Sequence, residues 1–136
     1  AVYREYGWLT LLQQPELHLH PALQAALADV LIDATAEGSR PAGLPATKFR
    51  KLIIETHSEH LLLRALKRVR QSSRQQSVPE GLTLASDDVC VLYFEPSLDG
   101  RTRVKRLRVS PDGDFMDRWP RGFFTEREGE LFDGEE

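Results

Sequence analysis

All four histidines of the chain fall in two short clusters that also contain carboxylates. The first cluster is QQPELHLHP, with Glu16, His18 and His20, and the second is ETHSEH, with His57 and His60. Imidazole and carboxylate groups at such close spacing can bind a metal ion, move a proton or contact a phosphate. The candidate chemistry of this chain therefore lies at two points that are far apart in the sequence.

Each cluster follows a short apolar run that predicts a strand buried in a parallel sheet. The first run is Gly7 to Leu12, and the second is KLIIE, Lys51 to Glu55. Because ligands bind at the carboxyl ends of the strands in parallel α/β sheets, the position of both clusters favours a binding site.

A helix is predicted after each cluster. Pro21 suits the first turn of the first helix, and Gly38 suits its end. The apolar stripe expected to be buried on this helix comprises Leu23, Leu27, Val30, Leu31 and Ala34. Thr56 and Glu59 have the spacing of a capping box, so the second helix is expected to begin there. Its buried stripe comprises Leu62, Leu66 and Val69.

The order strand, helix, strand, helix predicts a βαβα unit over residues 1–70. Residues 71–87 are polar and predict a surface linker. In residues 88–136, the apolar run from Val89 to Phe94 and the Asp99–Gly100 turn predict a β-hairpin, followed by an aromatic segment that docks on the body and an acidic end. Phe94 and Cys90 are expected to be packed, and the aromatic segment includes Phe115, Trp119, Phe123 and Phe124.

The composition excludes several classes of protein. The net charge of -3 argues against a dedicated nucleic-acid binder, and a single cysteine excludes a disulfide framework. These features, with no signal peptide or apolar membrane span, predict a cytoplasmic protein. The absence of an initiator methionine suggests a piece of a longer chain. DNA contact is the alternative to an ordinary solvated face for two basic sets: Arg64, Lys67, Arg68, Arg70 and Arg74, and Arg103, Lys105, Arg106 and Arg108.

The residues alone leave three interpretations of the clusters open. The first is nucleotide chemistry, in which an apolar strand delivers polar groups to Mg²⁺ and to the attacking water, and the next strand supplies a group that senses the γ-phosphate. The second is a Zn²⁺ or Mn²⁺ site built from the two histidine pairs and Glu16. The third is structural, with Thr56 and Glu59 capping a helix and His18 and His20 satisfying backbone groups.

LLQQPELHLHP and KLIIETHSEHLLL together resemble the ATPase heads of the ABC type, in the branch of the RecF, structural-maintenance-of-chromosomes and overcoming-lysogenization-defect families. They are most similar to a bacterial AAA-type ATPase group with the pattern [IL]-E-Q-P-E-L-H-L-H-P followed by E-T-H-S-E-H-L. That group ends in a domain of unknown function, which residues 88–124 resemble. The resemblance implies an α/β fold, namely the C-terminal lobe of an ABC-type head within a partial P-loop NTPase, with parallel strands and a C-terminal β-hairpin.

The resemblance also implies a role for each matching residue. Gln13 stands at the Walker B carboxylate that supports Mg²⁺, and Gln14 stands where many heads have the catalytic glutamate. Glu16 continues the motif as a candidate catalytic and metal-binding carboxylate. His20 stands at the D-loop, and His57 stands at the switch histidine that contacts the γ-phosphate. The implied cofactors are ATP and Mg²⁺.

Two departures from the pattern change the expectation. Gln13 lacks the charge that holds Mg²⁺. The chain also contains no G-x-x-x-x-G-K-[ST] phosphate loop and no signature loop. We therefore expect the isolated chain not to hydrolyse ATP, and we expect its partner to be a P-loop-containing N-terminal half or a second ATPase subunit, in a possible dimer of heads. The alternatives are a non-enzymatic remnant or interaction module, and a His/Glu metal-dependent hydrolase.

Overall fold

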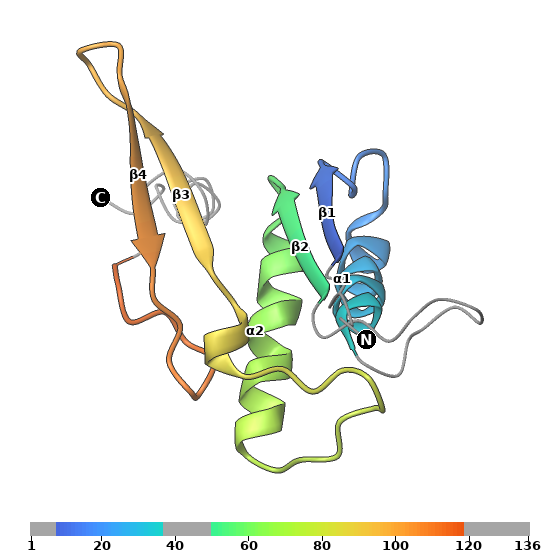
Figure 1. Ribbon diagram of the computed structural model, residues 1–136. Helices are drawn as coiled ribbons and strands as arrows, with labels where there is room; N and C mark the ends of the chain where they lie inside the picture. The colour runs from blue at the N-terminus through green and yellow to red at the C-terminus, as the bar shows by residue number, and fades with distance from the viewer. Residues whose placement is uncertain (1–7, 37–49, 119–136) are drawn as a thin grey trace, which may run out of the picture.

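The computed structural model describes residues 8–36 and 50–118. The described residues form a small α/β structure with two separate two-stranded sheets (Figure 1). The elements in chain order are β1 (Trp8–Gln13), α1 (Pro21–Thr35), β2 (Arg50–Glu55), α2 (Glu59–Ser73), a 3-10 turn (Ser86–Asp88), β3 (Val91–Pro96) and β4 (Thr102–Leu107). Strands β1 and β2 are parallel, and β3 and β4 are antiparallel. The predicted βαβα unit and C-terminal hairpin are confirmed.

The core lies between α1 and α2, which both cover the same face of the β1–β2 sheet (Figure 1). Ala28 of α1 is buried, and so are Leu61, Leu66 and Val69 of α2. No described element covers the opposite face of the sheet, where Leu9, Leu11 and Ile53 are each more than half exposed. The register pairs Leu9 with Lys51 and Leu11 with Ile53, so these side chains share that face.

An ion-pair cluster joins the two helices inside this core. Arg68 donates from Nε and Nη2 to the two carboxylate oxygens of Asp29, at 2.8 and 2.7 Å, and Arg64 donates to the same carboxylate at 2.7 Å. Arg68 is buried and also donates to Gln71. The Arg68 side chain is the first cause of a lowered pKa at Asp29, and the charge of Arg64 adds to it. The prediction of a solvated basic face is therefore wrong for Arg64 and Arg68.

The predicted apolar stripe of α1 is only partly correct. Leu23 and Val30 are more than half exposed, whereas Ala28 is the buried residue of this helix. The reason is that apolar residues surround α1 on nearly every side, so their spacing does not identify one buried face. The helix also ends at Thr35, before the predicted stop at Gly38, which lies outside the described residues.

The predicted capping box at the start of α2 is also wrong. The helix begins at Glu59, and its N-cap is Ser58, whose hydroxyl accepts a hydrogen bond from the Leu61 backbone N–H at 3.1 Å. Thr56 instead accepts a hydrogen bond from the Ser58 backbone N–H at 3.0 Å. Leu66 and Val69 are buried as expected, and α2 continues to Ser73, inside the predicted linker.

The turn that follows the hairpin is fastened to α2. Arg70 donates to the carbonyl oxygens of Asp112 and Gly113 and to the Asp114 carboxylate. Gly113 has φ +71, and a Cβ added there would lie 2.3 Å from the Leu66 carbonyl oxygen. Only glycine therefore fits this contact. Arg70, like Arg64 and Arg68, is a partnered residue and not part of a merely solvated face.

Two further predictions, that Phe94 and Cys90 are packed, are wrong. Phe94 is 61% exposed, and Cys90 is exposed and precedes β3 rather than packing within it. The Asp99–Gly100 turn is confirmed, with φ +77 at Gly100. Trp119, Phe123 and Phe124 lie outside the described residues. No helix in the described ranges has the length and apolar character required to cross a membrane.

Candidate functional site

The carboxyl ends of β1 and β2 lie side by side and bring the two histidine clusters to one edge of the sheet (Figure 1). Gln13 is the register partner of Glu55, and the Gln14 backbone N–H donates to the Glu55 carbonyl oxygen at 2.7 Å. The loop after β1 and the loop after β2 therefore begin next to each other. This is the arrangement that the parallel βαβα pattern predicts.

The loop after β1 turns sharply before α1. Gln14 and His18 adopt positive φ angles of 44° and 66°, and the Leu17 and Leu19 backbone N–H groups donate to the carbonyl oxygens of Gln14 and Glu16. His20 is the N-cap of α1, and its Nδ1 accepts a hydrogen bond from the Ala22 backbone N–H at 3.3 Å. His20 thus has the backbone-satisfying contact that the structural interpretation expected.

Glu16 connects the two loops. Glu16 is buried, with only 7% of the residue exposed, and its Oε1 accepts a hydrogen bond from the His57 backbone N–H at 2.9 Å. Oε2 is buried and has no hydrogen-bond partner among the described residues. Burial raises the pKa of Glu16, but the Thr56 hydroxyl, backbone N–H groups and the nearby His57 together outweigh it and hold the pKa below its ordinary value.

A second connection between the loops passes through Gln24, which the sequence did not single out. The Ser58 hydroxyl donates to Gln24 Oε1 at 2.6 Å, and Gln24 Nε2 donates to the Leu19 carbonyl oxygen at 2.9 Å. Ser58 caps α2 and Leu19 precedes α1, so this chain of hydrogen bonds joins the starts of both helices. The only sequence signal for it was a polar amide among the apolar residues of the first two turns of α1.

The remaining candidates differ in exposure. Gln13, His18, His20, His57 and His60 are exposed, and Gln14 is half-buried. Among the described residues, which include all four histidines, no three His, Cys, Asp or Glu side chains come together as a metal-binding group. The described geometry therefore gives no support to the metal-dependent hydrolase alternative.

One comparison with known proteins gives a result. Residues 4–64 match the family described as an AAA domain, putative AbiEii toxin, type IV toxin–antitoxin system. The match contains both clusters and both strands of the parallel sheet. No curated protein and no solved structure matches the chain. In its N-terminal part, the chain is therefore similar to an AAA domain of the P-loop ATPase type.

Proposed function

We propose that this chain forms one side of an ATP-hydrolysing site, the side that contains the Walker B strand, the D-loop and the switch histidine of an ABC-type head. The observation that carries the proposal is the hydrogen bond from the His57 backbone N–H to buried Glu16, which fixes the loop after β2 against the loop after β1. A γ-phosphate sensor must be held in place relative to the Walker B strand in this way.

In this proposal three side chains of the two loops have distinct roles. The His57 imidazole contacts the γ-phosphate, because its backbone is held by Glu16 while its side chain is exposed. Gln13 would help to hold the Mg²⁺, and Gln14 would orient the attacking water. Amide oxygens are acceptable but uncharged ligands, and the Glu16 carboxylate is engaged with the His57 N–H. The described residues thus fit Mg²⁺ only incompletely, and further ligands must come from the phosphate-binding side.

The phosphate-binding side comes from a P-loop-containing segment or subunit, since the sequence contains no G-x-x-x-x-G-K-[ST]. The open face of the β1–β2 sheet supports this part of the proposal. Leu9, Leu11 and Ile53 are 59%, 69% and 57% exposed there, whereas parallel sheets are normally covered on both faces. The same face also suits the second candidate function, a non-enzymatic module that binds a partner without turnover.

The His57→Ala substitution tests the proposal in the native protein or complex that joins this chain to a P-loop. We expect ATP turnover to fall about tenfold, the equivalent of one charge-assisted hydrogen bond to the transferred phosphoryl group. His60→Ala is the matched control, because His60 is exposed on the first turn of α2 and should leave turnover unchanged. Unchanged turnover in His57→Ala would remove this residue from the site and favour the non-enzymatic module.

Gln13→Glu addresses the departure at the Walker B position. The substitution restores a carboxylate at the end of β1, so we expect tighter Mg²⁺ binding and an ATP turnover raised about tenfold. The measurement is the Mg²⁺ dependence of hydrolysis in the same native assembly. Gln76→Glu, at an exposed position just after α2, adds the same charge away from the site and controls for net charge. A turnover that stays equal or falls would show that Gln13 does not occupy the metal-supporting position.

A further inference from the structure

The hairpin of β3 and β4 exposes an apolar face that no described element covers. The register pairs Leu92 with Arg106 and Phe94 with Val104, so these four side chains lie on one face. Leu92, Phe94 and Val104 are 51%, 61% and 54% exposed. Figure 1 shows the hairpin extending away from the β1–β2 sheet, and neither of its strands packs extensively on another described element. A contiguous apolar face of this kind indicates an interaction site.

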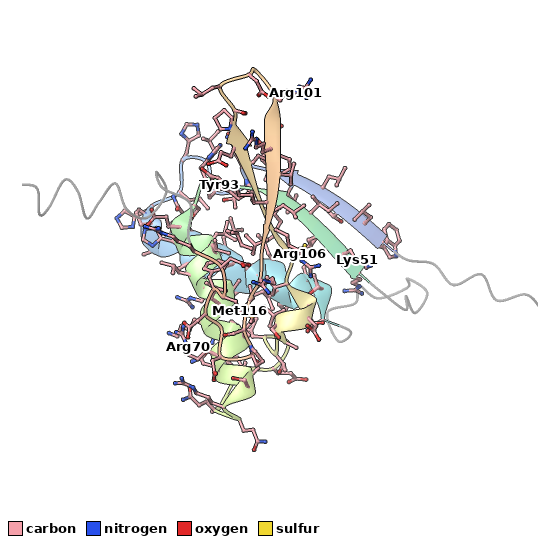
Figure 2. The ribbon with its side chains drawn as sticks, turned by 90° about the vertical axis from the view of Figure 1, so that its left-hand side faces the viewer. Lys51, Arg70, Tyr93, Arg101, Arg106 and Met116 are labelled. Atoms are coloured by element: carbon pink, nitrogen blue, oxygen red, sulfur yellow. The ribbon has the colours of Figure 1, made fainter. Side chains whose placement is uncertain are left out.

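The hairpin is also strongly basic. Residues 91–108 include two acidic side chains and five basic ones. Lys105 pairs with Glu95, and Arg108 pairs with Asp117. Within the described ranges, no ion pair is formed by the remaining basic residues, which are Arg101, Arg103 and Arg106. Figure 2 shows Arg101 at the tip of the hairpin and Arg106 nearer the body. The occupant of the face should therefore be both apolar and acidic.

The chain supplies such an occupant in residues 119–136, which lie outside the described residues. This segment has six acidic and two basic side chains. Its aromatic residues are Trp119, Phe123, Phe124 and Phe132. A second copy of the hairpin is a poorer match, because a contact between two copies of this face would bring two basic hairpins together.

The described chain ends in the correct place for this contact. Val109 and Phe115 form an antiparallel bridge, and the Met116 backbone N–H donates to the Arg108 carbonyl oxygen at 3.0 Å. Asp117 accepts hydrogen bonds from the Arg108 backbone and guanidinium, and these bonds lower the pKa of Asp117 to about 2. The chain is therefore held beside the end of β4 immediately before the segment 119–136 begins.

We propose that residues 119–136 dock on the hairpin face formed by Leu92, Phe94, Val104 and Arg106. The aromatic side chains cover the apolar residues, and the acidic side chains lie near the unpaired arginines. In this contact the acidic side chains of residues 119–136 balance the positive net charge of the hairpin. The contact does not depend on ATP binding. The inference can therefore fail or succeed independently of the proposed function.

Acrylamide quenching of Trp119 fluorescence in the full chain tests the inference. The chain has two tryptophans, so Trp8→Phe leaves Trp119 as the only reporter. We expect weak quenching in this parent and severalfold stronger quenching after Phe94→Asp or Arg106→Glu. Val30→Asp and Arg74→Glu are the matched controls, because both residues are exposed on or beside the helices, and they should match the parent. Added salt should increase quenching in the parent but not in Arg106→Glu.

Three results would overturn the inference. The first is strong quenching of Trp119 in the parent, equal to that in both hairpin variants. The second is a Trp119 that stays protected in both variants. The third is protection that disappears on dilution together with a dimer seen by sedimentation, which would assign the face to a second copy. Far-UV circular dichroism of each variant confirms that its fold is retained, and Arg106 lies on an exposed strand where substitution leaves the core intact.

Discussion

Asp29→Ala is expected to lower the free energy of unfolding by about 3 kcal/mol, measured by urea denaturation. The carboxylate accepts three hydrogen bonds from Arg64 and Arg68. The Arg68 side chain is only 10% exposed, so its guanidinium would remain charged in the core without its partner. The expected loss comes mainly from this uncompensated charge, rather than from the ion pair's own attraction.

Two further variants separate these contributions. Asp87→Ala removes an exposed carboxylate from the 3-10 turn and should change stability by less than about 0.5 kcal/mol. Asp29→Leu combined with Arg68→Met removes both members of the buried pair and should recover most of the lost stability. If Asp29→Ala unfolded at the same urea concentration as Asp87→Ala, the cluster would not stabilise the helix pair.

The Asp29 cluster also affects the candidate site, although it does not touch it. Helix α1 begins just after His20 and α2 begins just after Ser58, so both helices start at the edge of the sheet that holds the site. The cluster fixes the middle of α1 to α2, and the Ser58–Gln24–Leu19 hydrogen bonds fix their starts. Loosening the middle of the pair therefore removes part of the support for the loops on which the proposed function depends.

The sequence predicted the features that depend on local signals. The apolar runs identified both parallel strands, and Asp99–Gly100 identified the hairpin turn, because strand composition and turn chemistry act over a few residues. The edge at which the clusters meet was predicted by a topological rule rather than by a local signal. That rule brought Glu16 and His57 to neighbouring loops, and the structure places them in direct contact.

The features that sequence reasoning missed depend on distant partners. Arg68 was expected on a solvated basic face of the helix. Nothing near it in the chain indicated that it would be buried and paired with Asp29, which lies 39 residues away. Phe94 was expected in the core because it belongs to an apolar strand. The pattern of a strand does not indicate whether another element covers the face on which Phe94 lies, and here the residue is exposed. At α2, two hydroxyls competed for the cap, and the backbone path after β2 decided in favour of Ser58 over Thr56.

Glu16→Ala is expected to lower the free energy of unfolding by about 1–2 kcal/mol, because the partly buried His57 N–H loses its acceptor. Under the proposed function, ATP turnover in the protein or complex that joins this chain to a P-loop should fall by more than tenfold, because His57 loses its attachment to the loop after β1. Chemical denaturation and steady-state hydrolysis measure the two effects. Leu17→Ala, at the exposed neighbouring position, is the control and should leave both nearly unchanged.

Glu16→Gln separates the two roles that this carboxylate could have. The amide oxygen can still accept the His57 N–H, so a residue that only braces the loops should keep most of its stability and turnover. If the carboxylate also assists Mg²⁺ or water through its unpartnered Oε2, the Glu16→Gln variant should keep its stability but lose turnover as severely as Glu16→Ala. Equal stability losses in both variants would contradict the bracing role.

Acid pH provides an independent check on Glu16. Its pKa in the folded protein lies below the ordinary value of 4.5, so the ionised form stabilises the fold above that pH. This contribution is lost as the pH falls below 4.5 and through the lowered pKa, because the folded state then has to take up the proton that the unfolded chain already binds. The stability of the wild type relative to Glu16→Gln should therefore decline as the pH falls below 4.5. A stability difference that does not vary with pH would mean that the charge on this buried carboxylate does not hold the two loops together.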